Sequence, residues 1–234
     1  MKYEFSSEST CPLVLISLAT NEEVTIEPGA MVFHNNKISL NAHMNQNGSG
    51  LVGGIIRAAA RSLTSGENFF VTTAKGTAPD GLIAIAPKAM GSIKALEVGQ
   101  TTWRLNDGVF LACDGTVTYS MKRQPITLRS TIFGNNGGLF VMETAGTGTL
   151  LVSGLGEIVE LELDGEDTLV VDNIHVVAWQ NTLSYEIKTA SGLLGVRTGE
   201  NIVNAFSGRG KILIQTRNLG EFVGTILPYI PAKR

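Results

Sequence analysis

The sequence predicts an all-β fold built from three similar units in tandem, in a pseudo-threefold arrangement. Three observations support this prediction. Short runs of Val, Ile, Leu and Thr alternate in polarity, Gly, Asn or Asp turns separate them about every ten residues, and the same patterns recur along the chain. Because alternation buries one face of each strand and wets the other, each unit is expected to be a sandwich or a roll.

The recurrence is visible when the sequence is compared with itself. Segments 97–112 and 163–178 both place an acidic turn before an apolar run, about 66 residues apart, and a third copy begins at 21–33. Each copy ends in a Gly-rich turn and an alternating strand, at 81–85, 146–152 and 208–214.

These repeats divide the chain into three β units, 1–90, 91–155 and 156–234. A unit of this size buries little apolar surface by itself, so the three are expected to dock into one compact body. The 27 glycines recur at corresponding places in the repeats, so we expect them to be turn residues more than ligand-binding residues. With 43% hydrophobic residues, the composition excludes a disordered chain.

The first unit carries an insertion, residues 41–65, that the other two lack. Its apolar and basic residues allow one short helix near 54–64. Two interpretations stay open: a helix that covers an exposed sheet face or edge, or a surface that contacts a protein partner or an anionic membrane. The candidate residues for that surface are Leu51, Ile55, Ile56, Arg57 and Arg61.

The sequence contains no well-supported motif for catalysis, for a cofactor or for a metal. Residues 48–53 match the Gly-x-Gly-x-x-Gly pattern of dinucleotide sites, but no strand-helix-strand context and no acid about 20 residues later accompany it. The histidines lack metal-ligand spacing, and neither a nucleophile elbow nor a phosphate-binding loop occurs. We therefore expect a protein that is not an enzyme and that has no cofactor and no metal.

Charge and cysteine content indicate the compartment and the partners. The net charge of −3 gives no global attraction for phosphates, and the cations near 122–129 and 209–217 have few aromatic neighbours, so we do not expect a nucleic-acid partner.

Two cysteines are too few for a disulfide framework and fit a reducing cytoplasm. The apolar stretch 11–19 follows acidic residues, unlike a signal peptide. We predict a cytoplasmic protein, with Cys113 in the core.

Four segments, 27–32, 66–70, 169–178 and 208–217, carry a family resemblance that extends over essentially the whole chain. The sequence resembles the mitochondrial-biogenesis (altered inheritance of mitochondria) family, as a bacterial member of unknown function. The resemblance implies a fold like that of the tryptophan RNA-binding attenuation protein, similar to a double-stranded β-helix and repeated within one chain. It implies no catalytic residues, and its eukaryotic branch is linked to the organisation of the inner mitochondrial membrane.

Architecture and the absence of catalytic motifs together predict a non-enzymatic scaffold or binding protein. We expect a homo-oligomer that associates with a protein partner or with a membrane surface. The alternative is a binder of RNA or of a small ligand in the clefts between β units, where glycines let a ligand approach backbone amides.

Overall fold

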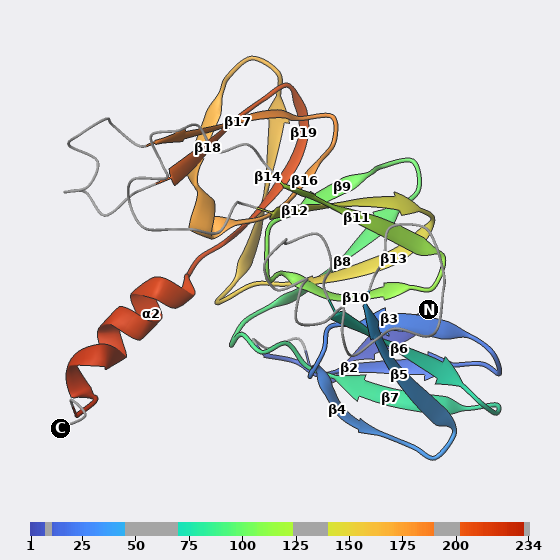
Figure 1. Ribbon diagram of the computed structural model, residues 1–234. Coiled ribbons are helices and arrows are strands. Elements are labelled where there is room, and N and C mark those ends of the chain that lie inside the picture. The colour runs from blue at the N-terminus through green and yellow to red at the C-terminus, as the bar shows by residue number, and fades with distance from the viewer. Residues whose placement is uncertain (8–10, 45–69, 124–139, 190–201, 232–234) are drawn as a thin grey trace.

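The computed structural model describes residues 1–7, 11–44, 70–123, 140–189 and 202–231. Within these residues the predicted all-β fold is confirmed, because strands form four sheets and a single α-helix lies near the C-terminus (Figure 1). The helix expected near 54–64 lies outside the described residues. Residues 41–44 of the predicted insertion belong to a strand, and its other residues, 45–65, lie outside the described ranges, so the insertion stays a prediction.

After an N-terminal strand, β1 (Lys2–Phe5), the strands fall into three consecutive sets of six. The first set is β2 (Val14–Leu18), β3 (Glu23–Ile26), β4 (Met31–His34), β5 (Ile38–Met44), β6 (Phe70–Gly76) and β7 (Gly81–Ile85). The second is β8 (Ile93–Val98), β9 (Trp103–Leu105), β10 (Phe110–Asp114), β11 (Val117–Arg123), β12 (Phe140–Gly146) and β13 (Gly148–Ser153). The third is β14 (Ile158–Asp164), β15 (Leu169–Asp172), β16 (Val176–Gln180), β17 (Ser184–Thr189), β18 (Ile202–Ser207) and β19 (Arg209–Gln215).

One pairing pattern recurs in all three sets. In the first set β7 lies between β2 and β4, and β6 lies between β3 and β5. The second and third sets pair their strands in the same antiparallel way. We call the sets units 1, 2 and 3. Each lies inside one of the segments 1–90, 91–155 and 156–234, whose boundaries stay a prediction.

Neighbouring units share their sheets. Strand β10 of unit 2 pairs with β3 of unit 1, which gives the six-stranded sheet β5-β6-β3-β10-β13-β8. In the same way β16 pairs with β9, which gives the sheet β11-β12-β9-β16-β19-β14. The remaining sheets, β1-β2-β7-β4 and β15-β18-β17, stand at the two ends of the row of units seen in Figure 1.

A β-bulge identifies equivalent residues in the three units. The register shifts within 31–33 of β4, 110–112 of β10 and 176–178 of β16, each time against the strand that ends its unit. A bulge places two residues of one strand opposite one of its partner and is a specific backbone feature. Its recurrence shows that Phe33, Ala112 and Ala178 occupy the same position.

Two glycines at equivalent places in units 1 and 2 are turn residues, as predicted. Gly29 and Gly108 stand in the equivalent turns before β4 and β10, at φ values of 82° and 75°. This left-handed backbone favours glycine because other residues clash there.

Three hydrophobic cores lie between the four sheets, and the first two combine residues of neighbouring units. The core of unit 1, around Ile16 and Ile26, includes Leu111 and Ala112 of unit 2. The core of unit 2 likewise includes Val177, Ala178 and Leu213 of unit 3. The core of unit 3, which contains Trp179 and Phe206, receives no residue from a following unit among those the structure describes.

The chain ends in an element that the sequence analysis missed. Helix α2 (Leu219–Ile226) follows β19 and continues into a 3-10 turn (Leu227–Tyr229). The repeats predict only β structure over the third unit, 156–234. The signal was present, because Leu219, Phe222, Val223 and Ile226 have the i, i+3, i+4, i+7 spacing of an amphipathic helix.

Candidate functional site

The residues that the sequence predicted as a partner or membrane surface are not placed by the structure. Leu51, Ile55, Ile56, Arg57 and Arg61 all lie within 45–69, outside the described residues. Their role stays a prediction. The candidate surfaces of the described β body and of α2 lie elsewhere.

Cys113 and His175 both have structural roles. Burial raises the pKa of the Cys113 thiol to about 12, which removes the thiolate a nucleophile needs. The His175 ring donates from Nδ1 to the Gln215 carbonyl at 2.7 Å, so its Nε2 accepts from the Asn218 amide at 3.2 Å. Over the described ranges, no three His, Cys, Asp or Glu residues gather where they could hold a metal ion.

Two carboxylates at the surface of the β body form ion pairs that join strands. Glu160 on β14 accepts from Lys211 at 2.6 Å and from Lys94 at 2.8 Å, and the hydrogen bond from Lys211 is the main cause of its lowered pKa. Glu143 on β12 accepts from Lys122 at 2.7 Å and from Arg104 at 3.0 Å, and its pKa is lowered chiefly by the Lys122 hydrogen bond. A carboxylate held ionised by cations is a poor general acid at neutral pH.

These pairs also bear on the alternative of RNA binding. Lys122 and Lys211 belong to the two basic clusters of the sequence, and each forms an ion pair with a carboxylate of the protein itself. Arg129 of the first cluster lies outside the described residues.

Helix α2 is fixed to the β body at Asn218, the residue that precedes it. Asn218 is 3% exposed, and its Oδ1 accepts from the Glu221 backbone N–H at 2.8 Å, which caps the helix. Its amide nitrogen donates to His175 Nε2, as described above. One buried asparagine thereby connects the β body to the start of the helix.

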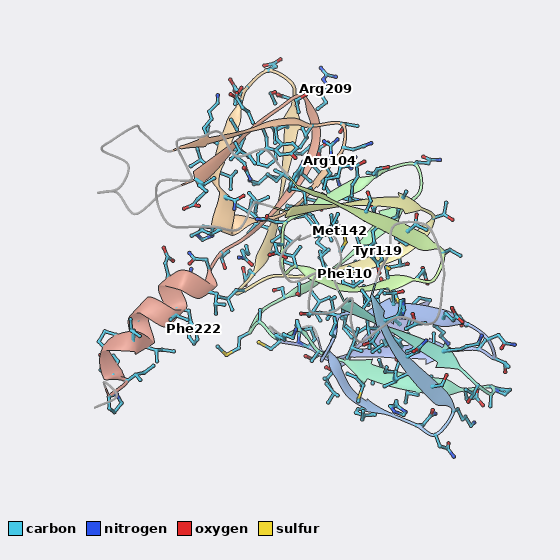
Figure 2. All side chains as sticks on the ribbon, in the orientation of Figure 1. Arg104, Phe110, Tyr119, Met142, Arg209 and Phe222 are labelled. Carbon is cyan, nitrogen blue, oxygen red and sulfur yellow. The ribbon has the colours of Figure 1, made fainter. Side chains whose placement is uncertain are left out.

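Beyond that anchor the helix stands away from the β body, and no residue of α2 itself is buried (Figures 1 and 2). Its exposed apolar residues form one stripe, which continues past the helix end. We call this stripe the α2 surface. It consists of Leu219, Phe222, Val223, Ile226, Leu227 and Ile230, which are between 40% and 66% exposed.

A cavity of about 380 Å³ lies where α2 leaves the β body. One side is formed by the connectors that lead into units 2 and 3, which meet in a parallel bridge between Gly91 and Gly156. The lining residues are Met90, Leu155, Gly156, Arg217, Asn218, Glu221, Phe222 and Thr225. The cavity is therefore close to the predicted location of a ligand between units, with a mixed apolar and polar lining.

Exposed apolar residues also occur at the two ends of the row of units. On β4, Met31, Val32 and Phe33 are 40%, 52% and 46% exposed, and on β15, Val170 is 58% exposed. Both strands are the last in their sheets. We call β4 and β15 the open edges.

Comparisons with known proteins agree with the resemblance seen in the sequence. The family described as mitochondrial biogenesis AIM24 matches residues 3–217, a segment that ends just before α2. An uncharacterised protein of Streptococcus pyogenes serotype M6 is 44% identical over 232 residues, which cover 99% of this chain and 92% of the relative.

A crystal structure of a Streptococcus pyogenes protein has the same fold, with a TM-score of 0.81 and 41% identity over 98% of this chain and 99% of that one. Among the residues that the structure describes, no helix has the length and hydrophobicity needed to cross a membrane. The expected family is confirmed: the chain belongs to the mitochondrial biogenesis AIM24 family.

Proposed function

We propose that this protein is a non-enzymatic scaffold that binds a partner protein through the α2 surface. The observation that carries the proposal is an apolar helix, fixed at Asn218 and otherwise exposed along its whole length. Monomeric proteins rarely expose a contiguous apolar surface of this kind, and where they do it marks an interaction site.

The spacing of the stripe indicates how a partner would hold it. Leu219, Phe222, Val223 and Ile226 lie on one face at i, i+3, i+4 and i+7, the anchor pattern of helices that lie in an apolar groove. The β body fixes only the helix start, so a groove could enclose the stripe without displacing a described core residue.

The charges of the helix favour a protein groove over an anionic membrane. Helices that lie on membranes carry Lys and Arg on their polar face. The polar face of α2 has Gly220, Glu221, Gly224 and Thr225, so its one charge is negative. An anionic bilayer would repel that charge, whereas an apolar protein groove is indifferent to it.

The test is site-specific photo-cross-linking in the full-length chain. A photoreactive phenylalanine analogue at position 222 should give one cross-linked product with a partner protein in the native cells. Ile226→Glu should abolish that product because it places a charge inside the groove. The analogue at position 225, on the polar face, is the matched control and should give no product.

The remaining outcomes contradict the proposal. A product with twice the mass of the chain would put a second copy on the α2 surface. Flotation of the purified protein with phosphatidylglycerol vesicles, abolished by Ile226→Glu, would assign the surface to a membrane. A chain that gives neither a cross-link nor flotation has no partner on this surface.

A second candidate, binding of a small amphiphile, is favoured by the cavity beside α2. Its volume is within the range of ligand sites, and Phe222 and Leu155 would contact an apolar tail while Arg217 would contact an anionic head. Laurate is a suitable probe for calorimetry. Saturable binding that Arg217→Gln weakens would support this candidate, and no heat at millimolar laurate would exclude it.

A further inference from the structure

We propose that the anchor between the β body and α2 is a pH-sensitive switch, in which protonation of His175 releases the helix. The anchor is the side-chain contact between His175, on the 3-10 turn η2 (Asn173–His175), and Asn218 at the start of α2. The inference goes beyond partner binding and does not depend on a partner, because it concerns only how the chain holds its own helix.

Three hydrogen bonds in series make up the anchor. His175 donates from Nδ1 to the Gln215 carbonyl at 2.7 Å, and the Asn218 amide nitrogen donates to His175 Nε2 at 3.2 Å. Asn218 Oδ1 accepts from the Glu221 backbone N–H at 2.8 Å. The series therefore runs from the end of β19 through the His175 ring to the first turn of α2.

Backbone groups at the two ends of the series determine which atom carries each proton. The Gln215 carbonyl can only accept, so Nδ1 of the ring carries a proton. The Glu221 backbone N–H can only donate, so the oxygen of the Asn218 amide faces it and the amide nitrogen faces the ring. Nε2 must then offer its lone pair, and the anchor requires the neutral form of His175.

Protonation of Nε2 is incompatible with this arrangement. The new N–H would face the Asn218 amide nitrogen, which is also a donor. A flip of the Asn218 amide would turn its oxygen toward the ring, but its nitrogen would then face the Glu221 backbone N–H and the helix cap would be lost. One added proton therefore breaks either the bond to the β body or the cap of α2.

The other side of the ring cannot adjust to relieve this mismatch. The Gln215 side chain donates to the Ile174 carbonyl at 2.8 Å and accepts from the Leu155 backbone N–H at 2.9 Å. Its backbone lies in β19, opposite Ile158 of β14. Because Gln215 is held in this way, the contact that must separate is the one to Asn218.

The charged groups around His175 provide no ion pair that would compensate the added charge. They are Asp172 before its own turn, Glu157 and Arg217 beside the end of β19, and Glu221 on α2, whereas β16 and β18 carry no charged residue. Asp172 accepts from the backbone N–H of its own turn. Over the described ranges, none of the ion pairs includes His175.

Few other contacts oppose the release of α2. No residue of the helix is buried, and the cavity beside the anchor has Leu155 of the β body and Phe222 of the helix in its lining. His175 is only partly buried, so a proton can reach it from solvent. Histidine is the residue type that ordinarily changes charge between about pH 5 and pH 8, and protonation of histidines at contacts is a known form of switch.

The test is hydrogen exchange of the full-length chain at about pH 7.5 and about pH 5, with each rate divided by the intrinsic rate at that pH. Protection of the amides in α2 should fall about tenfold in acid, the effect of losing one hydrogen bond. Protection in β16 and β19 should stay the same at both pH values, because the β body keeps its fold.

Two variants give opposite expectations. His175→Gln cannot take up a proton, so protection of α2 should not depend on pH. In Asn218→Asp one carboxylate oxygen still caps the helix and the other accepts from protonated Nε2, so acid should raise the protection of α2 instead of lowering it. Circular dichroism at both pH values verifies that each variant is folded.

Any of four results would overturn the proposal. They are equal protection of wild-type α2 at both pH values, a fall in protection that β16 and β19 share, a fall that His175→Gln retains, and a fall in Asn218→Asp like that of the wild type. The wild-type profile alone can overturn the proposal, whether or not a variant folds. The purified chain contains no partner, so failure here and failure of the partner proposal are distinguishable.

Discussion

The backbone N–H of Asn106 donates to the carbonyl oxygen of Val177 at 2.9 Å, across the junction of units 2 and 3. Glu27 makes the same bond to Leu111 at 2.8 Å, across the junction of units 1 and 2. Both acceptors are the bulged residues of their strands. The two junctions therefore share even single hydrogen bonds. Each unit depends on its neighbour for the pairing of its strands and for part of its hydrophobic core.

That dependence predicts the effect of Leu213→Ala. Leu213 belongs to β19 of unit 3 but is fully buried in the core of unit 2. The substitution should lower the free energy of unfolding by about 2–5 kcal/mol and leave a single transition, because two units share the lost contacts. Urea unfolding followed by tryptophan fluorescence and by circular dichroism measures this. Two separate transitions, of which only one shifts, would contradict it.

The ion pairs of Glu160 predict a pH-dependent loss of stability. Because its pKa is lower in the folded chain, the carboxylate stabilises the fold above its unfolded pKa of about 4.3, and this contribution is lost as the pH falls through the folded pKa. Glu160→Gln should cost about 0.5–1 kcal/mol at pH 7, since the pair is partly exposed to solvent. Thermal melts at pH 7 and pH 3 should show the difference disappearing in acid; an equal difference at both pH values would argue against this role.

The two cysteines should differ sharply in reactivity. Cys11 is exposed, whereas burial holds the Cys113 thiol protonated with a pKa of about 12. Iodoacetamide at pH 8 should modify Cys11 alone in the native chain and both cysteines in 6 M guanidinium chloride, as read by mass spectrometry. Native modification of Cys113 at a comparable rate would show that this part of the core opens.

Replacement of Asn218 should loosen α2 without unfolding the β body. Asn218→Ala removes the helix cap and the bond to His175, at a cost of about 1 kcal/mol to the helix. Hydrogen exchange in α2 should then accelerate by up to about tenfold while exchange in β16 and β19 is unchanged. Asn218→Ser keeps a capping oxygen and is the matched control, with a smaller acceleration; identical exchange in all three proteins would mean that the cap does not hold α2.

The sequence could predict the strands because alternation and turns are local signals. The alternating strands predicted at 81–85, 146–152 and 208–214 are β7, β13 and β19, and Cys113 is in the core. Local patterns do not specify which strands pair, so they do not predict the exchange of β10 and β16 into neighbouring units. That exchange is set by contacts between residues far apart in the sequence, Ile26 with Ala112 and Leu105 with Ala178.

The candidate surfaces were harder to predict than the fold. The sequence from Leu219 to Ile226 has helical spacing, but the repeat pattern assigns this segment to the third β unit. The apolar residues of β4 have the same sequence pattern as a buried strand. Phe33 differs from Ala112 because β4 is the last strand of its sheet whereas β10 pairs with β3, and only the sheet order shows this. The residues predicted as a surface in the first unit lie outside the described ranges and stay a prediction.

The most direct measurement of partner binding by the α2 surface is the photo-cross-link at position 222, compared between the wild-type chain and Ile226→Glu. We predict one product with a protein other than this chain in the native cells, and we expect Ile226→Glu to abolish it because a charge would lie inside an apolar groove. The same analogue at position 225, on the polar face of the helix, should give no product. A product that Ile226→Glu leaves unchanged, or equal products from positions 222 and 225, would contradict this role of α2.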